Sequence, residues 1–216
     1  MDIEDRDFKI GLLKEFWNRR NKKLVPPSDN GIGIKKQKFL VFYNLIAKSL
    51  GEPYTLSNMK AFEQGPVYYD IYSYVKNTDV YLEKVLVEKQ TYSDDIINAA
   101  LTLAESESYE SLSKITHSLD LWKNNFDNEY NERIINEHFE YDNNNISIED
   151  VTDRDDNIVK ILYDYNLYIY NNYDLEKIQN KIYALEKEHK ELIMQIISGR
   201  NHHLHNLFEE LSKMDT

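Results

Sequence analysis

The residues best suited to chemistry lie in one short run near the end of the chain, Arg-Asn-His-His-Leu-His at positions 200–205. On a helix, His202 and His205 would lie about one turn apart, a spacing at which two imidazoles can bind one metal ion. A zinc site needs a third protein ligand, and no glutamate lies between the two histidines. The run alone therefore predicts no metal site.

The same run permits a second interpretation, as a ribonuclease site. Arg200, Asn201 and His205 match the pattern Arg-Asn-x-x-x-His and so resemble the signature of the HEPN-domain nucleases. The resemblance implies that Arg200 stabilises the charge of a phosphate while His205 acts as a general acid or base. A solvated or packed helix end uses the same residue types, and this is the interpretation that we favour.

Elsewhere in the chain, no set of residues forms a recognisable catalytic centre. The absence of cysteine excludes disulfides, thiolate nucleophiles and cysteine-based zinc sites. His117 follows Ser113 and Thr116 without an acidic residue placed to orient it, so we expect a structural, hydrogen-bonded histidine. The carboxylates between positions 153 and 156 lack the spacing of a calcium loop. The sequence therefore predicts neither an enzyme nor a bound cofactor.

The charge of the chain bears on its partners. The 216 residues carry a formal net charge of −12, which repels a phosphate backbone. The early basic residues, between Arg19 and Lys38, are expected to form a solvated helix end, so nucleic acid is not an expected partner. The acidic remainder suits a basic protein, such as one that handles nucleotides or RNA. No signal peptide or bilayer-spanning apolar stretch is visible, which predicts a cytoplasmic protein without membrane contact.

Apolar spacing predicts a mainly α fold, in which a compact helical domain with a few short strands is followed by a C-terminal helical hairpin. The compact domain is expected to span residues 35–145, and an N-terminal helix and arm at 1–34 would pack on it. The polar, turn-like run of asparagines at 143–145 marks the expected boundary to a C-terminal helical extension at 146–216.

Local signals place the helices of the main domain. A buried helix is expected over 35–50, because apolar residues recur every three or four positions and Gly51 provides a left-handed C-cap. Short extended pieces are expected over 54–64. Pro66 suits the first turn of the next helix, where its missing N–H costs nothing, and Ser93 is expected to cap a further helix.

The extension is predicted to contain two helices. The first would carry the apolar residues between Ile158 and Ile169. The second has apolar residues at alternating steps of three and four between Leu175 and Ile196, which is a heptad-like seam. Such a seam needs a partner, and the preceding helix folded back as a hairpin is our first choice. Self-association into a homo-oligomer or a bound protein are the alternatives.

Three separated blocks of residues carry a family resemblance. They are Gln37-Lys38-Phe39-Leu40, then Ala61-Phe62-Glu63-Gln64-Gly65-Pro66-Val67 with Tyr72, and Leu112-Ser113-x-x-Thr116-His117 with Trp122. In order and spacing these blocks resemble the Panacea domain, which SocA-like and GepA-like proteins typify. The sequence departs from the family pattern at Phe62 and Leu121, where Trp and Pro are favoured. It departs again at Lys36, where an apolar residue is usual.

The resemblance implies an antitoxin that neutralises a cognate toxin by direct binding, as in bacterial and prophage toxin–antitoxin loci. Family members neutralise varied toxins, including small alarmone synthetases, and a SocA-like member is a protease adaptor. An adaptor or anti-defence role is therefore an alternative, beside the nuclease.

The motif residues have types that specify turns and cores, so a structural role is favoured for Gln37, Lys38, Gly65, Pro66, Val67, Thr116, His117 and Trp122. Tyrosine offers a large contact area at low entropic cost. We therefore expect toxin contacts on exposed tyrosines, namely Tyr68, Tyr69 and Tyr72.

Overall fold

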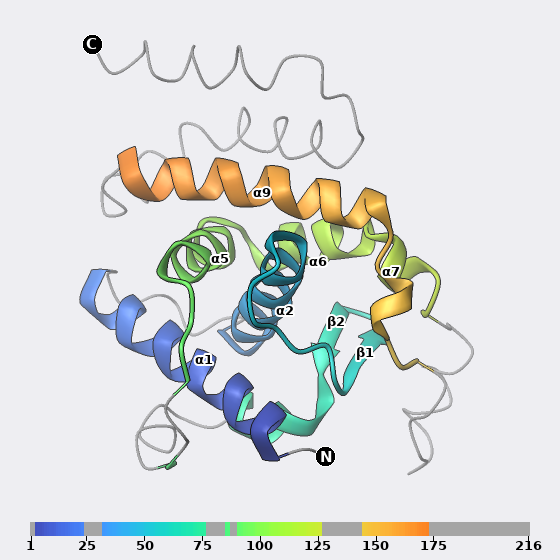
Figure 1. The fold of residues 1–216 in the computed structure, drawn as a ribbon, viewed down its shortest axis with the longest axis horizontal. Coiled ribbons are helices and arrows are strands. Elements are labelled where there is room, and N and C mark those ends of the chain that lie inside the picture. Colours follow the sequence, from blue (N-terminus) through green and yellow to red (C-terminus); the bar gives the residue numbers. More distant parts are fainter. Residues whose placement is uncertain (1–2, 24–31, 77–84, 87–89, 127–143, 173–216) are drawn as a thin grey trace.

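The computed structural model describes residues 3–23, 32–76, 85–86, 90–126 and 144–172. These residues form helices packed around α2, with a small β-hairpin at one side, which confirms the predicted mainly helical fold with a few short strands (Figure 1). The helices are α1 (Ile3–Lys23), α2 (Ile32–Leu50), α3 (Tyr72–Lys76), α5 (Asp94–Ser106), α6 (Tyr109–His117), α7 (Asp120–Lys123) and α9 (Asp153–Asn172). The strands are β1 (Met59–Phe62) and β2 (Gly65–Tyr68), and the short 3-10 helices are η1 (Tyr69–Ile71) and η2 (Ile148–Asp150).

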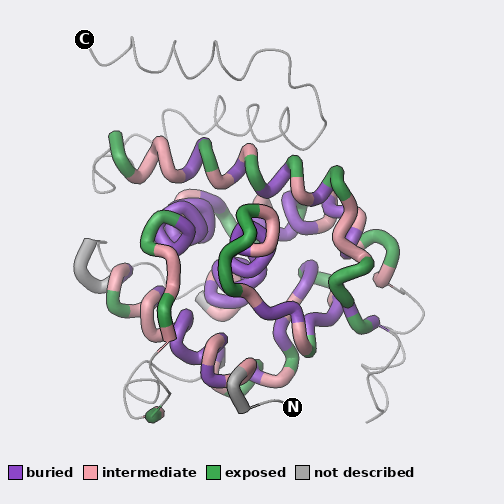
Figure 2. Tube along the Cα trace, in the orientation of Figure 1, coloured by how far each residue is buried: buried purple, intermediate pink, exposed green. Residues whose placement is uncertain are grey.

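The core forms around α2, on which α1, α5, α6 and α9 all pack. Every residue from Phe39 to Ala47 is buried, as expected for a helix that is covered on all sides (Figure 2). The helix ends as predicted, because Gly51 adopts a φ of +76° and the N–H of Glu52 donates to the carbonyl of Ala47 at 2.9 Å. The buried helix that the sequence predicted is thus the centre of the fold.

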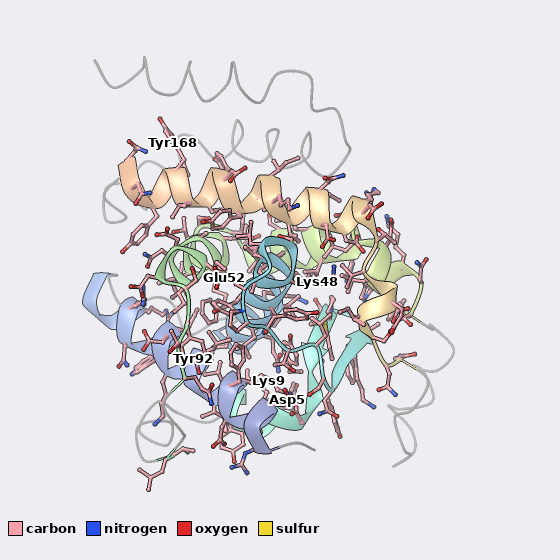
Figure 3. All side chains as sticks on the ribbon, in the orientation of Figure 1. Asp5, Lys9, Lys48, Glu52, Tyr92 and Tyr168 are labelled. Atoms are coloured by element: carbon pink, nitrogen blue, oxygen red, sulfur yellow. The ribbon has the colours of Figure 1, made fainter. Side chains whose placement is uncertain are left out.

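The first helix of the predicted extension belongs to this same core. The side chains of Ile158, Val159 and Leu162 on α9 are buried in the one hydrophobic cluster that also contains α2 and α5. Lys48, near the end of α2 (Figure 3), forms an ion pair of 3.0 Å with Asp156. Within the described residues, α9 therefore packs as part of the compact domain. The second predicted helix, with its heptad-like seam, lies outside the described residues.

The reason why α9 joins the compact domain lies in the run of asparagines at 143–145, which was expected to mark a boundary. Asn144 is buried, and both its backbone and its side chain bind Ala61 of β1, so residues that looked like a linker form part of the sheet edge. Among the described residues, no helix has the length and apolar character needed to cross a membrane.

The expectation of a solvated basic helix end is wrong for the basic residues whose side chains are described as buried. Arg20 forms an ion pair of 3.1 Å with Glu105 of α5, and both side chains are buried. Lys36 and Lys38 are buried on α2. The charge run was misinterpreted because helix packing buries these side chains against distant parts of the chain, where Arg20 meets Glu105 and Lys38 donates to the carbonyl of Pro66.

The hairpin corrects a further expectation. Pro66 lies in β2, paired with Ala61, and not in the first turn of a helix. Gly65 begins this strand with a φ of +93°, which completes a tight turn after Glu63 and Gln64. Helical structure starts only at Tyr69, after the strand. Proline is tolerated here because β2 is an outer strand, where a missing N–H breaks no ladder bond.

Candidate functional site

The outer edge of β2 is closed by two adjacent side chains of α2. Gln37 binds both backbone polar groups of Tyr68. Its Nε2 donates to the backbone carbonyl at 3.1 Å, and its Oε1 accepts from the backbone N–H at 2.9 Å. Lys38 Nζ donates to the carbonyl of Pro66 at 3.2 Å. Since Pro66 has no N–H to satisfy, these side chains take the place of a neighbouring strand. Residues of the first motif block therefore hold the strand that contains the end of the second block.

The other edge of the hairpin is closed in a similar way. The N–H of Ala61 donates to the carbonyl of Asn144 at 2.9 Å, and Asn144 Nδ2 donates back to the carbonyl of Ala61 at 3.1 Å. The N–H of Ile146 donates to the carbonyl of Met59 at 2.9 Å. With both edges engaged by this chain, the hairpin does not offer an open edge for strand addition by a partner.

The third motif block holds the turn of the hairpin. A Cβ built on Gly65 would lie 2.3 Å from Thr116 Oγ1 and 2.4 Å from Lys38 Nζ, so glycine is required by space as well as by its positive φ. Trp122 Nε1 donates to the carbonyl of Phe62 at 2.9 Å. The ring of His117 stacks on Trp122 with centroids 3.9 Å apart and planes 15° apart. Residues from all three motif blocks thus meet at one turn.

Two basic side chains lie at this meeting point. Burial lowers the pKa of Lys38 to about 7, because the ammonium is fully removed from water. The pKa of His117 is lowered mainly by burial and further by the charge of Lys38. A hydrogen bond to the backbone of Glu63 and the charge of that residue act in the opposite direction. Burial therefore shifts both groups toward their neutral forms.

Aromatic side chains occupy the outer face of the hairpin. The rings of Phe62 and Tyr69 stack with centroids 6.2 Å apart, and Lys60 Nζ lies 5.8 Å from the centroid of the Tyr69 ring. Tyr69 is 40% exposed and Tyr72 is 42% exposed. These two tyrosines fulfil the expectation of exposed aromatic residues beside the middle motif block.

The third expected contact residue, Tyr68, is a correction. Its exposed fraction is 0%, and its hydroxyl donates to the carbonyl of Thr55 at 2.7 Å. Successive residues of a strand point to opposite faces, so Tyr68 points into the core while Val67 points outward and is only half-buried. The expectation was wrong because it placed Pro66 and Val67 in a helix, where this alternation does not occur.

Two structural ion and hydrogen-bond sites were not predicted from the sequence. Lys9 Nζ, fully buried on α1, lies 2.6 Å from Asp70 Oδ2 and 3.0 Å from the carbonyl of Ser57. Asp155, also fully buried, accepts the first two N–H groups of α7 at 2.7 and 3.0 Å. The second site positions Trp122. It was recognisable only as helix-start charge, because the helix that it caps begins 35 residues earlier in the chain.

A groove of about 620 Å³ runs beside β1, between residues 54–59 and 145–149. Glu149 is the one charged side chain along its lining. In the described part of the chain, no three His, Asp or Glu side chains gather closely enough to hold a metal ion. Arg200 and His205, the alternative nuclease pair, lie outside the described residues.

No family model matches the chain, and no curated protein or solved structure matches it. Function is therefore inferred from the residues around the hairpin.

Proposed function

We propose that the protein is an antitoxin that neutralises a cognate toxin by direct binding. The supporting observation is the convergence of the three blocks that resemble the Panacea domain. Gln37 and Lys38 bind β2, Gly65 packs on Thr116, and Trp122 binds the carbonyl of Phe62. Residues that match a family pattern by chance in three distant segments would have no reason to contact one another. Here residues of each block contact residues of another block.

The same contacts divide the site into supports and a recognition surface. The buried members hold the hairpin, while Tyr69 and Tyr72 present aromatic surface to solvent. Exposed tyrosines beside a rigid support are well suited to bind a protein, since little side-chain entropy is lost on contact. The net charge of −12 favours a basic toxin surface and would accelerate the encounter. A cytoplasmic location belongs to the same proposal.

Co-expression tests the proposal. The product of the neighbouring gene is expressed alone and together with this protein, and growth and co-purification are measured. We expect a toxic neighbour whose effect is relieved by a stable complex. Replacing Tyr69 and Tyr72 together by alanine is expected to weaken the complex at least about tenfold, as for exposed aromatic residues at the centre of an interface.

Tyr109→Ala is the matched control, because this tyrosine is 44% exposed on α6 and carries no motif role. Far-UV circular dichroism checks that each variant folds. If this protein alone arrests growth and His205→Ala abolishes the arrest, the nuclease alternative replaces the antitoxin. If neither gene is toxic, the proposal fails and a host or phage target of an adaptor or anti-defence protein becomes the next candidate.

A further inference from the structure

A buried lysine lies under the turn of the hairpin. Lys38 is fully enclosed between α2, β2 and α6, and its Nζ donates to the carbonyl of Pro66. Within the described residues, no carboxylate forms an ion pair with Lys38. An ammonium normally uses three donors and a counter-charge when buried. A neutral amine needs neither, so the enclosure suits the deprotonated form of Lys38.

A second basic group faces the same turn from α6. The ring of His117 lies flat on Trp122, and its Nε2 is buried without a hydrogen-bond partner. A protonated imidazole would place a second donor at this atom, and burial without an acceptor disfavours that state. The charged groups that act on His117 are Lys38 from α2 and the exposed carboxylate of Glu63 from the turn, while Trp122 from α7 is uncharged.

We propose that Lys38 and His117 form a proton-sensitive lock: the hairpin is held tightly on α2 and α6 while both groups are neutral, and protonation of either loosens it. Lys38 is buried and Gly65 lies close against its Nζ, so bulk water does not solvate an added charge there. The lock is a property of the free protein and does not depend on the identity of a toxin. Protonation of the lock changes the stability of the hairpin that carries Tyr69.

The direction of the pH effect follows because folding lowers the pKa values of both Lys38 and His117. The folded protein lowers the pKa of Lys38 from 10.5 to about 7, so the unfolded chain binds the proton more readily. The stabilisation is complete above about pH 10.5 and is lost as the pH falls toward 7. Between pH 8.5 and pH 6 the unfolding equilibrium constant is expected to rise about thirtyfold through Lys38. His117 adds a further loss below its usual pKa of 6.5.

Tryptophan fluorescence reads the lock directly. A protonated imidazole quenches an indole on which it stacks, so Trp122 reports the charge of His117. The chain has two tryptophans, and Trp17→Phe leaves Trp122 as the single reporter. In this background we expect a fluorescence transition with a midpoint below pH 6.5 that is absent in His117→Gln.

Two variants should move that midpoint in opposite directions. Lys38→Met removes a positive charge and is expected to raise it, whereas Glu63→Gln removes a negative charge and is expected to lower it. Glu110→Gln, an exposed carboxylate on the first turn of α6, is the control and should leave the midpoint unchanged. If Lys38→Met fails to fold, Glu63→Gln decides alone, because Glu63 is exposed. A midpoint that neither charge moves would overturn the lock.

Urea unfolding at pH 8.5 and pH 6 tests the stability side. The ratio of the two unfolding constants is expected to be about thirtyfold smaller in Lys38→Met than in the wild type. Lys160→Met, on the exposed face of α9, should keep the wild-type ratio. Equal ratios in wild type and Lys38→Met would show that the buried amine carries no proton-linked stability, and the proposal would be rejected.

Discussion

Gly65 offers a quantitative test of how the motif blocks hold the hairpin, because the chain contains a matched glycine. Gly51 and Gly65 both have positive φ values, +76° and +93°. A Cβ on Gly51 meets nothing within 4 Å, whereas a Cβ on Gly65 would lie 2.3 Å from Thr116 Oγ1 and 2.4 Å from Lys38 Nζ. Gly51→Ala therefore measures backbone strain alone, and Gly65→Ala measures strain plus the loss of the close contact.

The expected magnitudes differ clearly. Left-handed strain on alanine costs about 1–2 kcal/mol at either position. At Gly65 the added Cβ must also displace Thr116, whose hydroxyl donates to backbone carbonyls of α6 at 3.0 Å, and Lys38 from Pro66. Losing these two hydrogen bonds, the Thr116 bond being shared between two carbonyls, at about 1 kcal/mol each brings the total for Gly65→Ala to roughly 3–4 kcal/mol. Urea unfolding at pH 8 measures both variants. Equal losses within 1 kcal/mol would refute the close packing of the three blocks.

Two further substitutions test the supports of the site. Asp155→Asn is expected to lower the free energy of unfolding by about 2–4 kcal/mol. The buried carboxylate accepts hydrogen bonds from three backbone N–H groups, and in the variant an amide nitrogen, itself a donor, would face some of these donors. Asp153→Asn, exposed two residues earlier, should change it by less than about 0.5 kcal/mol, and a similar loss in both would contradict the capping role. Tyr68→Phe is expected to cost about 1–2 kcal/mol in thermal or urea unfolding, because the carbonyl of Thr55 loses its buried donor. Tyr109→Phe, at an exposed site, should be neutral, and a neutral Tyr68→Phe would argue against the inward orientation of Tyr68.

The elements that depend on local signals were accessible from the sequence. The apolar residues of α2 and the glycine at its end predicted a buried helix with a left-handed cap, and both are present. Ser93 occupies the predicted N-cap position of α5, whose first turn carries Asp94 and Asp95, but its side chain makes no capping hydrogen bond. These signals act over a few residues, so that a single sequence contains them in full.

The elements that depend on distant partners could not be predicted from the sequence. Pro66 occupies a strand because Gln37 and Lys38, nearly 30 residues earlier, satisfy the outer edge of that strand. Asn144 pairs with Ala61 and so changes an apparent linker into a sheet edge. In the first case side chains replace a backbone partner, and in the second the partner lies 83 residues away along the chain. No periodicity in the sequence indicates either contact. The sequence gives the order of the motif blocks, while the contacts between them are seen only in the structure.

The central claim is neutralisation by binding, and a titration with purified components tests it most directly. The activity of the purified neighbouring gene product is measured while this protein is added in increasing amounts. We expect activity to fall linearly and to vanish at a fixed molar ratio, with Tyr69→Ala/Tyr72→Ala requiring a large excess. Full inactivation at far below stoichiometric amounts would indicate an enzyme, and undiminished activity at excess protein would contradict the antitoxin account.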